Sequence, residues 1–152
     1  MYVPRHFRAE ELVWPEFHAE HQHRGQTLFM AFDARALVTL DRLRERFGPL
    51  VVNDWLWGGE FRLSGLRPLR SGVGAALSQH VFGRAFDCKF RQVAAPEVRA
   101  ELLAGKLRGP GQVFEHVARI EDFPGMGWFH FDTGNHDAAR DGILVVTPHG
   151  VQ

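Results

Sequence analysis

Two short segments of the chain carry histidine and aspartate at spacings that could bind a metal ion. The segment "SQHVFGRAFD" places His80 and Asp87 seven positions apart, and "WFHFD" places His130 and Asp132 two positions apart. In both segments the polar groups alternate with apolar side chains, as in a β-strand with one buried face. Imidazole nitrogens and carboxylate oxygens are common metal ligands in proteins. Whether these residues bind a metal depends on whether the fold brings them together.

The strands that must position these groups are predicted from the same alternation. The apolar side chains of the two segments belong to the core face, and they are Phe86, Cys88, Phe90, Phe129 and Phe131. If the two strands are neighbours and share one core, Asp87 and His130 project together from the opposite, open face. His80 lies in the loop before the first strand, from which it can fold over them. Two histidines and one carboxylate then converge.

This ligand set suits a catalytic zinc ion, which takes about three protein ligands and leaves a fourth position for water. Water bound to zinc becomes acidic enough to yield hydroxide near neutral pH. A histidine and an aspartate in one loop–strand segment are usually ordinary polar residues. The matching second strand, with His130 flanked by aromatic residues, is what favours a metal site.

The remaining segments predict a mixture of helices and strands. Helices are expected at residues 6–13, 33–49 and 95–105. Strands are expected at residues 50–54, 84–90, 116–121, 127–134 and 143–148. Residues 56–79 are rich in glycine, have no clear period, and are expected to form a long loop, which in a compact domain is usually functional or disordered.

These elements indicate an α+β fold in a single domain spanning residues 1–152. We expect an antiparallel sheet with flanking helices on one face and the polar site on the other. Residues 1–32 are expected to form an N-terminal extension that packs on this domain.

Composition limits the possible partners. The 152 residues include 18 lysines and arginines and 18 aspartates and glutamates, so net charge gives no reason to expect nucleic acid or an acidic membrane as a partner. The single cysteine, Cys88, cannot form an internal disulfide. No apolar run approaches the ~20 residues of a membrane span, and the first residues lack a signal-peptide core. We therefore expect a monomer that is made in a cytoplasm.

The two segments resemble the signatures of a known family. "SQHVFGRAFD" is similar to the Ser-x-His-x-x-Gly-x-Ala-x-Asp signature of zinc peptidases that cut bacterial cell-wall peptides, and "GWFHFD" is similar to their Trp-x-His-x-Asp signature. "SGLRP" at 64–68 is similar to their Ser-Gly-Tyr-Arg segment. These are the D-alanyl-D-alanine and L-alanyl-D-glutamate peptidases, including phage endolysins, which have the Hedgehog/DD-peptidase fold. The resemblance runs from about Leu37 to Asp132.

The resemblance implies a site and an activity. The implied zinc ligands are His80, Asp87 and His130, and the implied substrate contacts are Ser78, Arg67 and Trp128. Arg67 would hold the scissile carbonyl oxygen or a carboxylate of the substrate. The implied function is cleavage of peptidoglycan stem peptides by a zinc-bound water, on the cell wall after release or from within a phage particle.

The chain departs from the family at Gly127. Many members carry a catalytic acid there, three residues before the second zinc histidine. The nearest upstream acids are Glu121 and Asp122, and we favour Glu121 because the end of a strand holds a side chain more rigidly than a loop does. If neither is the base, the chain could be a zinc-binding structural or cell-wall-binding module without activity.

Other polar residues leave alternatives open. Arg84 could pair with Asp132, which would then be structural, or Asp132 could orient a ligand histidine. His136 could line the cleft. His18, His21 and His23 lie close together and could form a second metal site, although a polar loop with incidental histidines is the interpretation we favour.

Overall fold

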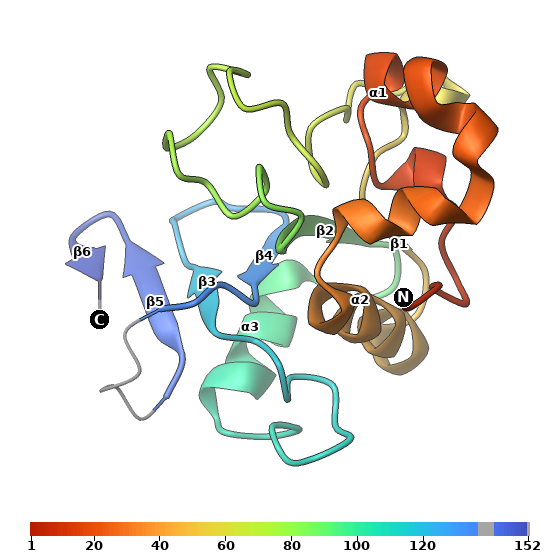
Figure 1. Ribbon diagram of the computed structural model, residues 1–152. Helices are drawn as coiled ribbons and strands as arrows, with labels where there is room; N and C mark the ends of the chain where they lie inside the picture. The colour runs from red at the N-terminus through yellow and green to blue at the C-terminus, as the bar shows by residue number, and fades with distance from the viewer. Residues whose placement is uncertain (137–141, 152) are drawn as a thin grey trace.

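The helix predicted to begin after Asp33 is the longest element of the protein. The computed structural model describes residues 1–136 and 142–151 (Figure 1). The Asp33 side chain accepts a hydrogen bond from the backbone nitrogen of Arg35, as expected of an N-cap. The apolar residues of this helix, which recur every three or four positions, are buried, and Gly48 follows the last turn.

The elements form in the following order. The helical segments are η1 (Ala9–Glu11), α1 (Pro15–His21), η2 (Gln22–Ala31), α2 (Ala34–Phe47), η3 (Trp55–Trp57) and α3 (Ala95–Leu103). The strands are β1 (Leu50–Val51), β2 (Ala85–Phe90), β3 (Arg119–Glu121), β4 (Phe129–Asp132), β5 (Leu144–Thr147) and β6 (Gly150–Val151). The helical elements within the described ranges are all too short or too polar to traverse a lipid bilayer.

The strands form one six-stranded sheet in the order β1-β2-β4-β3-β5-β6. Strands β2 and β4 are antiparallel neighbours, as expected from their alternation. The expectation of a wholly antiparallel sheet is wrong, because β3 and β5 pair in parallel. Strand β5 follows β4 in the chain, but it pairs with the other edge of β3.

The two faces of the sheet differ in character. Phe86, Cys88, Phe129 and Phe131 are fully buried, and they face a core to which α2 and α3 contribute. In Figure 1 these two helices lie below the sheet, and the long loop that precedes β2 arches over it. The fold is therefore α+β in a single small domain, with α2 and α3 on one face of the sheet.

The N-terminal segment differs from its prediction. The helix expected over residues 6–13 is reduced to the single turn η1, and the polar loop expected around the three histidines is helical, in α1 and η2. Pro15 occupies the first position of α1, where its missing N–H costs nothing. Residues of this segment, including Leu12 and Phe29, join the common core, so the segment packs on the rest of the domain.

Candidate metal centre

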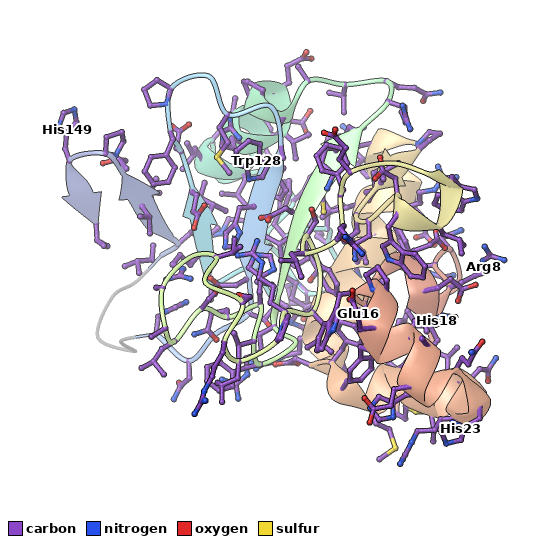
Figure 2. All side chains as sticks on the ribbon, turned by 90° about the horizontal axis from the view of Figure 1, so that it is seen from above. Arg8, Glu16, His18, His23, Trp128 and His149 are labelled. Atoms are coloured by element: carbon purple, nitrogen blue, oxygen red, sulfur yellow. The ribbon has the colours of Figure 1, made fainter. Side chains whose placement is uncertain are left out.

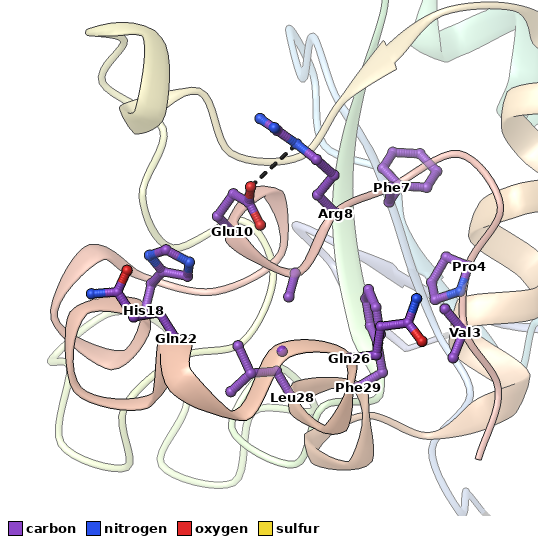
Figure 3. Close-up of a pocket in the computed structure, with 12 residues that line it drawn as sticks. Val3, Pro4, Phe7, Arg8, Glu10, His18, Gln22, Gln26, Leu28 and Phe29 are labelled. Atoms are coloured by element: carbon purple, nitrogen blue, oxygen red, sulfur yellow. Dashed lines mark ion pairs between the residues drawn. The ribbon is translucent and has the colours of Figure 1, made fainter.

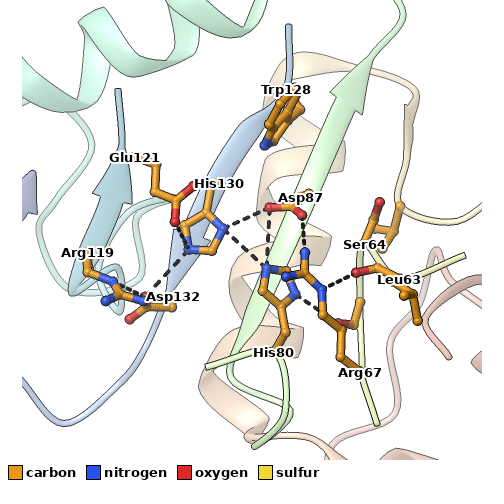
Figure 4. A network of polar contacts seen from close by, with 12 residues as sticks. Leu63, Ser64, Arg67, His80, Asp87, Arg119, Glu121, Trp128, His130 and Asp132 are labelled. Carbon is orange, nitrogen blue, oxygen red and sulfur yellow. Dashed lines mark hydrogen bonds and ion pairs between the residues drawn. The ribbon is translucent and has the colours of Figure 1, made fainter. Parts of the chain in front are cut away.

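The register of β2 and β4 brings the two strand ligands face to face. Asp87 lies directly opposite His130, and the Nδ1 atom of His130 is 2.8 Å from Oδ1 of Asp87. The Nε2 atom of His80 is 3.3 Å from Nδ1 of His130 and 3.4 Å from Oδ1 of Asp87 (Figure 4). The three residues therefore form a group, with donor atoms within 4.8 Å of one another, that could hold a metal ion.

Two close contacts between backbone segments position His80 beside Asp87 and His130. Gly83, between His80 and β2, has a φ of +65°, and a Cβ there would lie 2.1 Å from the carbonyl oxygen of Ala31. Gly65 would place a Cβ 2.1 Å from the carbonyl oxygen of Leu12. Only glycine fits at either position. The turn before β2 is thus held against the N-terminal segment.

The hydrogen bonds of His80 fix which nitrogen faces the cluster. Its Nδ1 lies 2.9 Å from the carbonyl oxygen of Gly65, which can only accept, so Nδ1 carries the proton. The lone pair of Nε2 then points at Asp87 and His130. Burial lowers the pKa of His80, which is 2% exposed, and so favours this neutral form. A neutral imidazole with a carbonyl behind it is the usual form of a metal-ligating histidine.

His130 lies between two carboxylates. Burial alone would lower its pKa, but the contacts with Asp132 and Asp87 raise it above the usual range. Its Nε2 is buried, has no hydrogen-bond partner, and lies 3.6 Å from Oδ2 of Asp132 and 3.9 Å from Oε1 of Glu121. Without a metal, a proton on His130 would balance Asp87. A metal cation bound by the cluster would also balance the charge of Asp87. The His130 ring could then be neutral, with its one proton on Nε2.

Asp87 is held as an anion. Burial would raise its pKa, but hydrogen bonds with His130 and His80 keep it well below its ordinary value. Its second oxygen, Oδ2, accepts a 2.7 Å hydrogen bond from the Arg67 guanidinium, which also donates to the carbonyl oxygen of Leu63. Arg67, expected to contact substrate, thus contacts the carboxylate of a candidate ligand.

Asp132 has a different partner from the one suggested by the sequence. Its side chain is fully buried and accepts hydrogen bonds from Nε of Arg119, 2.6 Å, and from the Gly134 backbone nitrogen, 3.0 Å. His136 Nε2 is 2.7 Å from Oδ1 of Asp132, the oxygen that also accepts from Gly134, whereas Arg119 bonds to Oδ2. Arg84, the residue before β2, instead has its guanidinium carbon 5.7 Å from the centroid of the Phe82 ring. Since Asp132 also lies beside His130, it is placed to orient that ring.

The two acids before β4 diverge. Glu121, at the end of β3, points toward His130 (Figure 4). Asp122 forms an ion pair with Arg99 of α3, with 3.1 Å between Oδ1 and Nε. Arg99 also donates to the carbonyl oxygens of Trp128 and Met126, so α3 fastens the whole segment that leads into β4. Asp122 is therefore directed away from the cluster.

Ser78 and Trp128 are the other two residues expected to contact substrate. Trp128 is 42% exposed and lies on the same side of β4 as His130, next to Asp87 in Figure 4. The half-buried Ser78 opens the turn that carries His80, and its carbonyl oxygen accepts from the Val81 nitrogen. Within the described ranges, no hydrogen bond joins the Ser78 hydroxyl to the cluster.

Sequence reasoning overlooked Lys89 and Ser64. Lys89 lies two residues after Asp87 on the same face of β2, and its Nζ donates to Ser64 Oγ at 2.8 Å and to the carbonyl oxygens of Asp87 and Val52. Burial lowers the pKa of Lys89 to about 8. The alternation of β2 indicated that Lys89 lies on the polar face, but it could not predict that Ser64, from the long loop, contacts Lys89.

The histidines of the N-terminal segment and of the β5–β6 hairpin lie away from the cluster. In Figure 2, His18 and His23 are on the N-terminal helices and His149 is on the β5–β6 hairpin, apart from Trp128. A cavity of about 290 Å³ lies beside His18 and contains the 3.2 Å ion pair of Arg8 with Glu10 (Figure 3). Across residues 1–136 and 142–151, His80, Asp87 and His130 are the one group with metal-binding geometry, so His18, His21 and His23 do not form a second.

Comparisons with protein-family models, with curated proteins and with solved structures found no match to this chain.

Proposed function

We propose that the chain is a zinc-dependent peptidase that cleaves the stem peptides of bacterial peptidoglycan. The observation that carries the proposal is the convergence of His80, Asp87 and His130 on the open face of the sheet. The same residues match the zinc ligands of the cell-wall peptidases that the sequence resembles. The Glu121 carboxylate lies 3.9 Å from Nε2 of His130, the ring nitrogen that faces away from Asp87. We also propose that the six-stranded sheet, with its helices on the opposite face, is a Hedgehog/DD-peptidase-like fold.

The spacing of the donor atoms supports zinc. Tetrahedral donors at ~2.1 Å from a zinc ion lie about 3.4 Å from one another. The Nε2 atom of His80 lies 3.3 and 3.4 Å from its two neighbours, and the remaining pair is 2.8 Å apart. Two imidazoles and one carboxylate leave one position free for water or substrate. When bound, zinc would supply Lewis acidity, which lowers the pKa of a coordinated water to about 7 and polarises a peptide carbonyl.

The protein's own groups supply the remaining parts of a hydrolytic site. Among the described residues, Glu121, whose side chain is 32% exposed, is the one carboxylate within 4.0 Å of a candidate ligand that is neither a candidate ligand itself nor paired with arginine. It would take the proton of the attacking water and pass it to the leaving amine, which makes it a general base and then a general acid. Arg67 would hold Asp87 in place and present positive charge where the peptide oxygen becomes negative.

Metal analysis followed by a cleavage assay tests the proposal. The chain would be purified without a histidine tag and its metal content measured. It would then be incubated with purified peptidoglycan and with soluble stem peptides, and mass spectrometry would locate any bond cut. We expect one zinc per chain, cleavage that a chelator abolishes and added zinc restores, and unchanged behaviour of the control His23→Ala, which alters an exposed histidine.

Two results would count against the proposal in different ways. If the chain binds no zinc, the proposed metal centre itself is wrong. A chain that holds one zinc and cuts no stem peptide would leave the metal centre and favour the alternative, a structural or cell-wall-binding module of a phage particle.

A further inference from the structure

A pocket of about 400 Å³ lies directly beside the metal cluster on the same face of the sheet. Its lining consists of Phe61, Ser64, Asp87, Lys89, Gly127 and Trp128. The paired residues of β2 and β4 explain its position. Asp87 pairs with His130 and Cys88 with Phe129, so the next residues in the same register are Lys89 and Trp128. One row across the two strands forms the metal centre, and the following row on the same face forms this pocket.

The pocket contains a cation without a carboxylate of its own. Among the described residues, no acidic side chain lies within 4.0 Å of the Lys89 ammonium group, whose partners are two carbonyl oxygens and the Ser64 hydroxyl. The nearby Asp87 is already bonded to Arg67 and to the two histidines. A partly buried ammonium group without a counterion is costly, and an anion that enters the pocket would compensate it.

The walls of the pocket determine what kind of anion it suits. The ring of Phe61 lies 4.1 Å from Nζ of Lys89, and Phe61 and Trp128 are 45% and 42% exposed. Ser64 accepts from Lys89 and keeps its own hydroxyl hydrogen for a ligand. Gly127 has open space where a side chain would begin. The pocket thus combines a cation and a hydroxyl donor with two apolar rings, which suits a carboxylate on a short apolar stem.

We infer that this pocket is the substrate subsite that accepts a carboxylate of the stem peptide. The Ser64 hydroxyl is its hydrogen-bond donor, and Lys89, whose three ammonium hydrogens are already donated, supplies the compensating positive charge. The rings of Phe61 and Trp128 contact the apolar atoms of the same substrate residue. This inference rests on the proposed peptidase function for the identity of the substrate, but not for the existence of the carboxylate site.

Binding of small probes tests the subsite without cleavage. The probes are acetyl-D-alanine, which has one α-carboxylate, its amide acetyl-D-alaninamide, and acetyl-D-isoglutamine, which has a side-chain carboxylate. They would be titrated into the zinc-loaded full chain, and the NMR signal of the Trp128 indole N–H, assigned with Trp128→Phe, would be followed. We expect at least one carboxylate probe to shift this signal and the amide not to shift it. The carboxylate that binds more tightly identifies the source.

The variant Lys89→Met separates this subsite from carboxylate binding to the metal or to Arg67. We expect the affinity for the carboxylate probe to fall about tenfold or more, because the positive charge that compensates the carboxylate is lost, with one zinc retained. Lys106→Met, which removes the other lysine of the chain at an exposed position, is the control and should bind as the parent does. Ser64→Ala, which keeps the lysine, should weaken binding by a smaller factor.

The inference is overturned if no probe shifts the Trp128 signal, or if Lys89→Met binds the carboxylate as tightly as the parent. Should Lys89→Met fail to fold, unchanged affinity in Ser64→Ala would have the same meaning. These outcomes are independent of the peptidase assay, because a chain that cuts no peptide could still bind the probes, and an active peptidase could lack this subsite.

Discussion

The protein has two groups of histidines, and among the described residues only the group in the sheet has donor atoms close enough together to hold a metal ion. In the N-terminal region, His18 and His21 lie three positions apart on α1, a spacing that makes side chains neighbours on a helix surface. Their rings nevertheless have separate aromatic partners, Trp55 for His18 and Phe17 for His21. In the sheet region, His80 and His130 are 2% and 3% exposed and face each other across 3.3 Å.

The difference shows what a metal site requires beyond suitable residue types. His80 and His130 come from segments 50 residues apart, and each has a polar group on its far side. The Gly65 carbonyl oxygen lies 2.9 Å from Nδ1 of His80, and the Asp132 carboxylate lies 3.6 Å from Nε2 of His130. The histidines of α1 are partly exposed and lack such support. A group behind each ligand fixes the ring orientation and reduces the conformational entropy lost when the metal binds.

The largest effect is expected from removing His80. His80→Ala should lose most bound zinc, because only two ligands remain, while much of the fold persists. In the parent, zinc at 100 times its dissociation constant should add about 2.7 kcal/mol to the free energy of unfolding, or roughly 5–10 °C in Tm for a domain of this size. The variant should show no such shift. Metal analysis and thermal unfolding with and without zinc measure both effects, and a variant that kept a full equivalent of zinc would contradict the assignment.

The next effect concerns the two acids before β4. Glu121→Gln should reduce stem-peptide cleavage by ~10²–10⁴-fold with zinc still bound, because it removes the proposed proton acceptor without changing its shape. Asp122→Asn should change turnover little, since Asp122 pairs with Arg99 and is 46% exposed, and such pairs contribute at most about 1 kcal/mol to stability. Turnover and zinc content would be measured on both variants. Equal turnover of Glu121→Gln and the parent would mean that the base lies elsewhere.

A smaller effect on zinc affinity is expected from changing Asp132, which lies beside Nε2 of His130. Asp132→Asn should weaken zinc binding by ~10–100-fold, because the neutral amide no longer balances Arg119 or orients the His130 ring. The matched control is Arg84→Gln, which removes the arginine that sequence suggested for Asp132 and that stacks on Phe82 instead. Competition with a chelating indicator gives both affinities. Equal losses in the two variants would indicate a general effect on the fold.

The site could be predicted from the sequence where a simple periodicity governs the structure. The alternation around Asp87 and His130 indicated two strands with one apolar face each, and the structure pairs these residues directly. Local pattern was sufficient because a strand has only two faces, so the burial of the phenylalanines determines where the polar side chains point.

The remaining parts of the site depend on contacts that local pattern does not contain. Arg119, the partner of Asp132, lies on a strand of three residues, which is too short to show a period. Ser64 and Phe61 reach Lys89 from a long loop without regular spacing. The parallel pairing of β3 with β5 was also missed, because alternation predicts strands but not their order in a sheet.

The smallest effect, no change at all, is expected in the N-terminal region. The triple variant His18→Gln, His21→Gln, His23→Gln removes as many imidazoles as a complete metal site would need, yet it should leave zinc stoichiometry and affinity as in the parent. The reason is that these rings belong to no group of converging donors, and His23 is exposed. Titration of the untagged parent and variant with zinc would measure both quantities. If the parent bound two zinc ions and the variant one, a helix surface without fixed ligands would be enough to bind zinc. The claim that a metal site needs a supporting group behind each ligand would then be wrong. If both bind one, the support behind His80 and His130 is what separates a metal centre from a chance cluster of histidines.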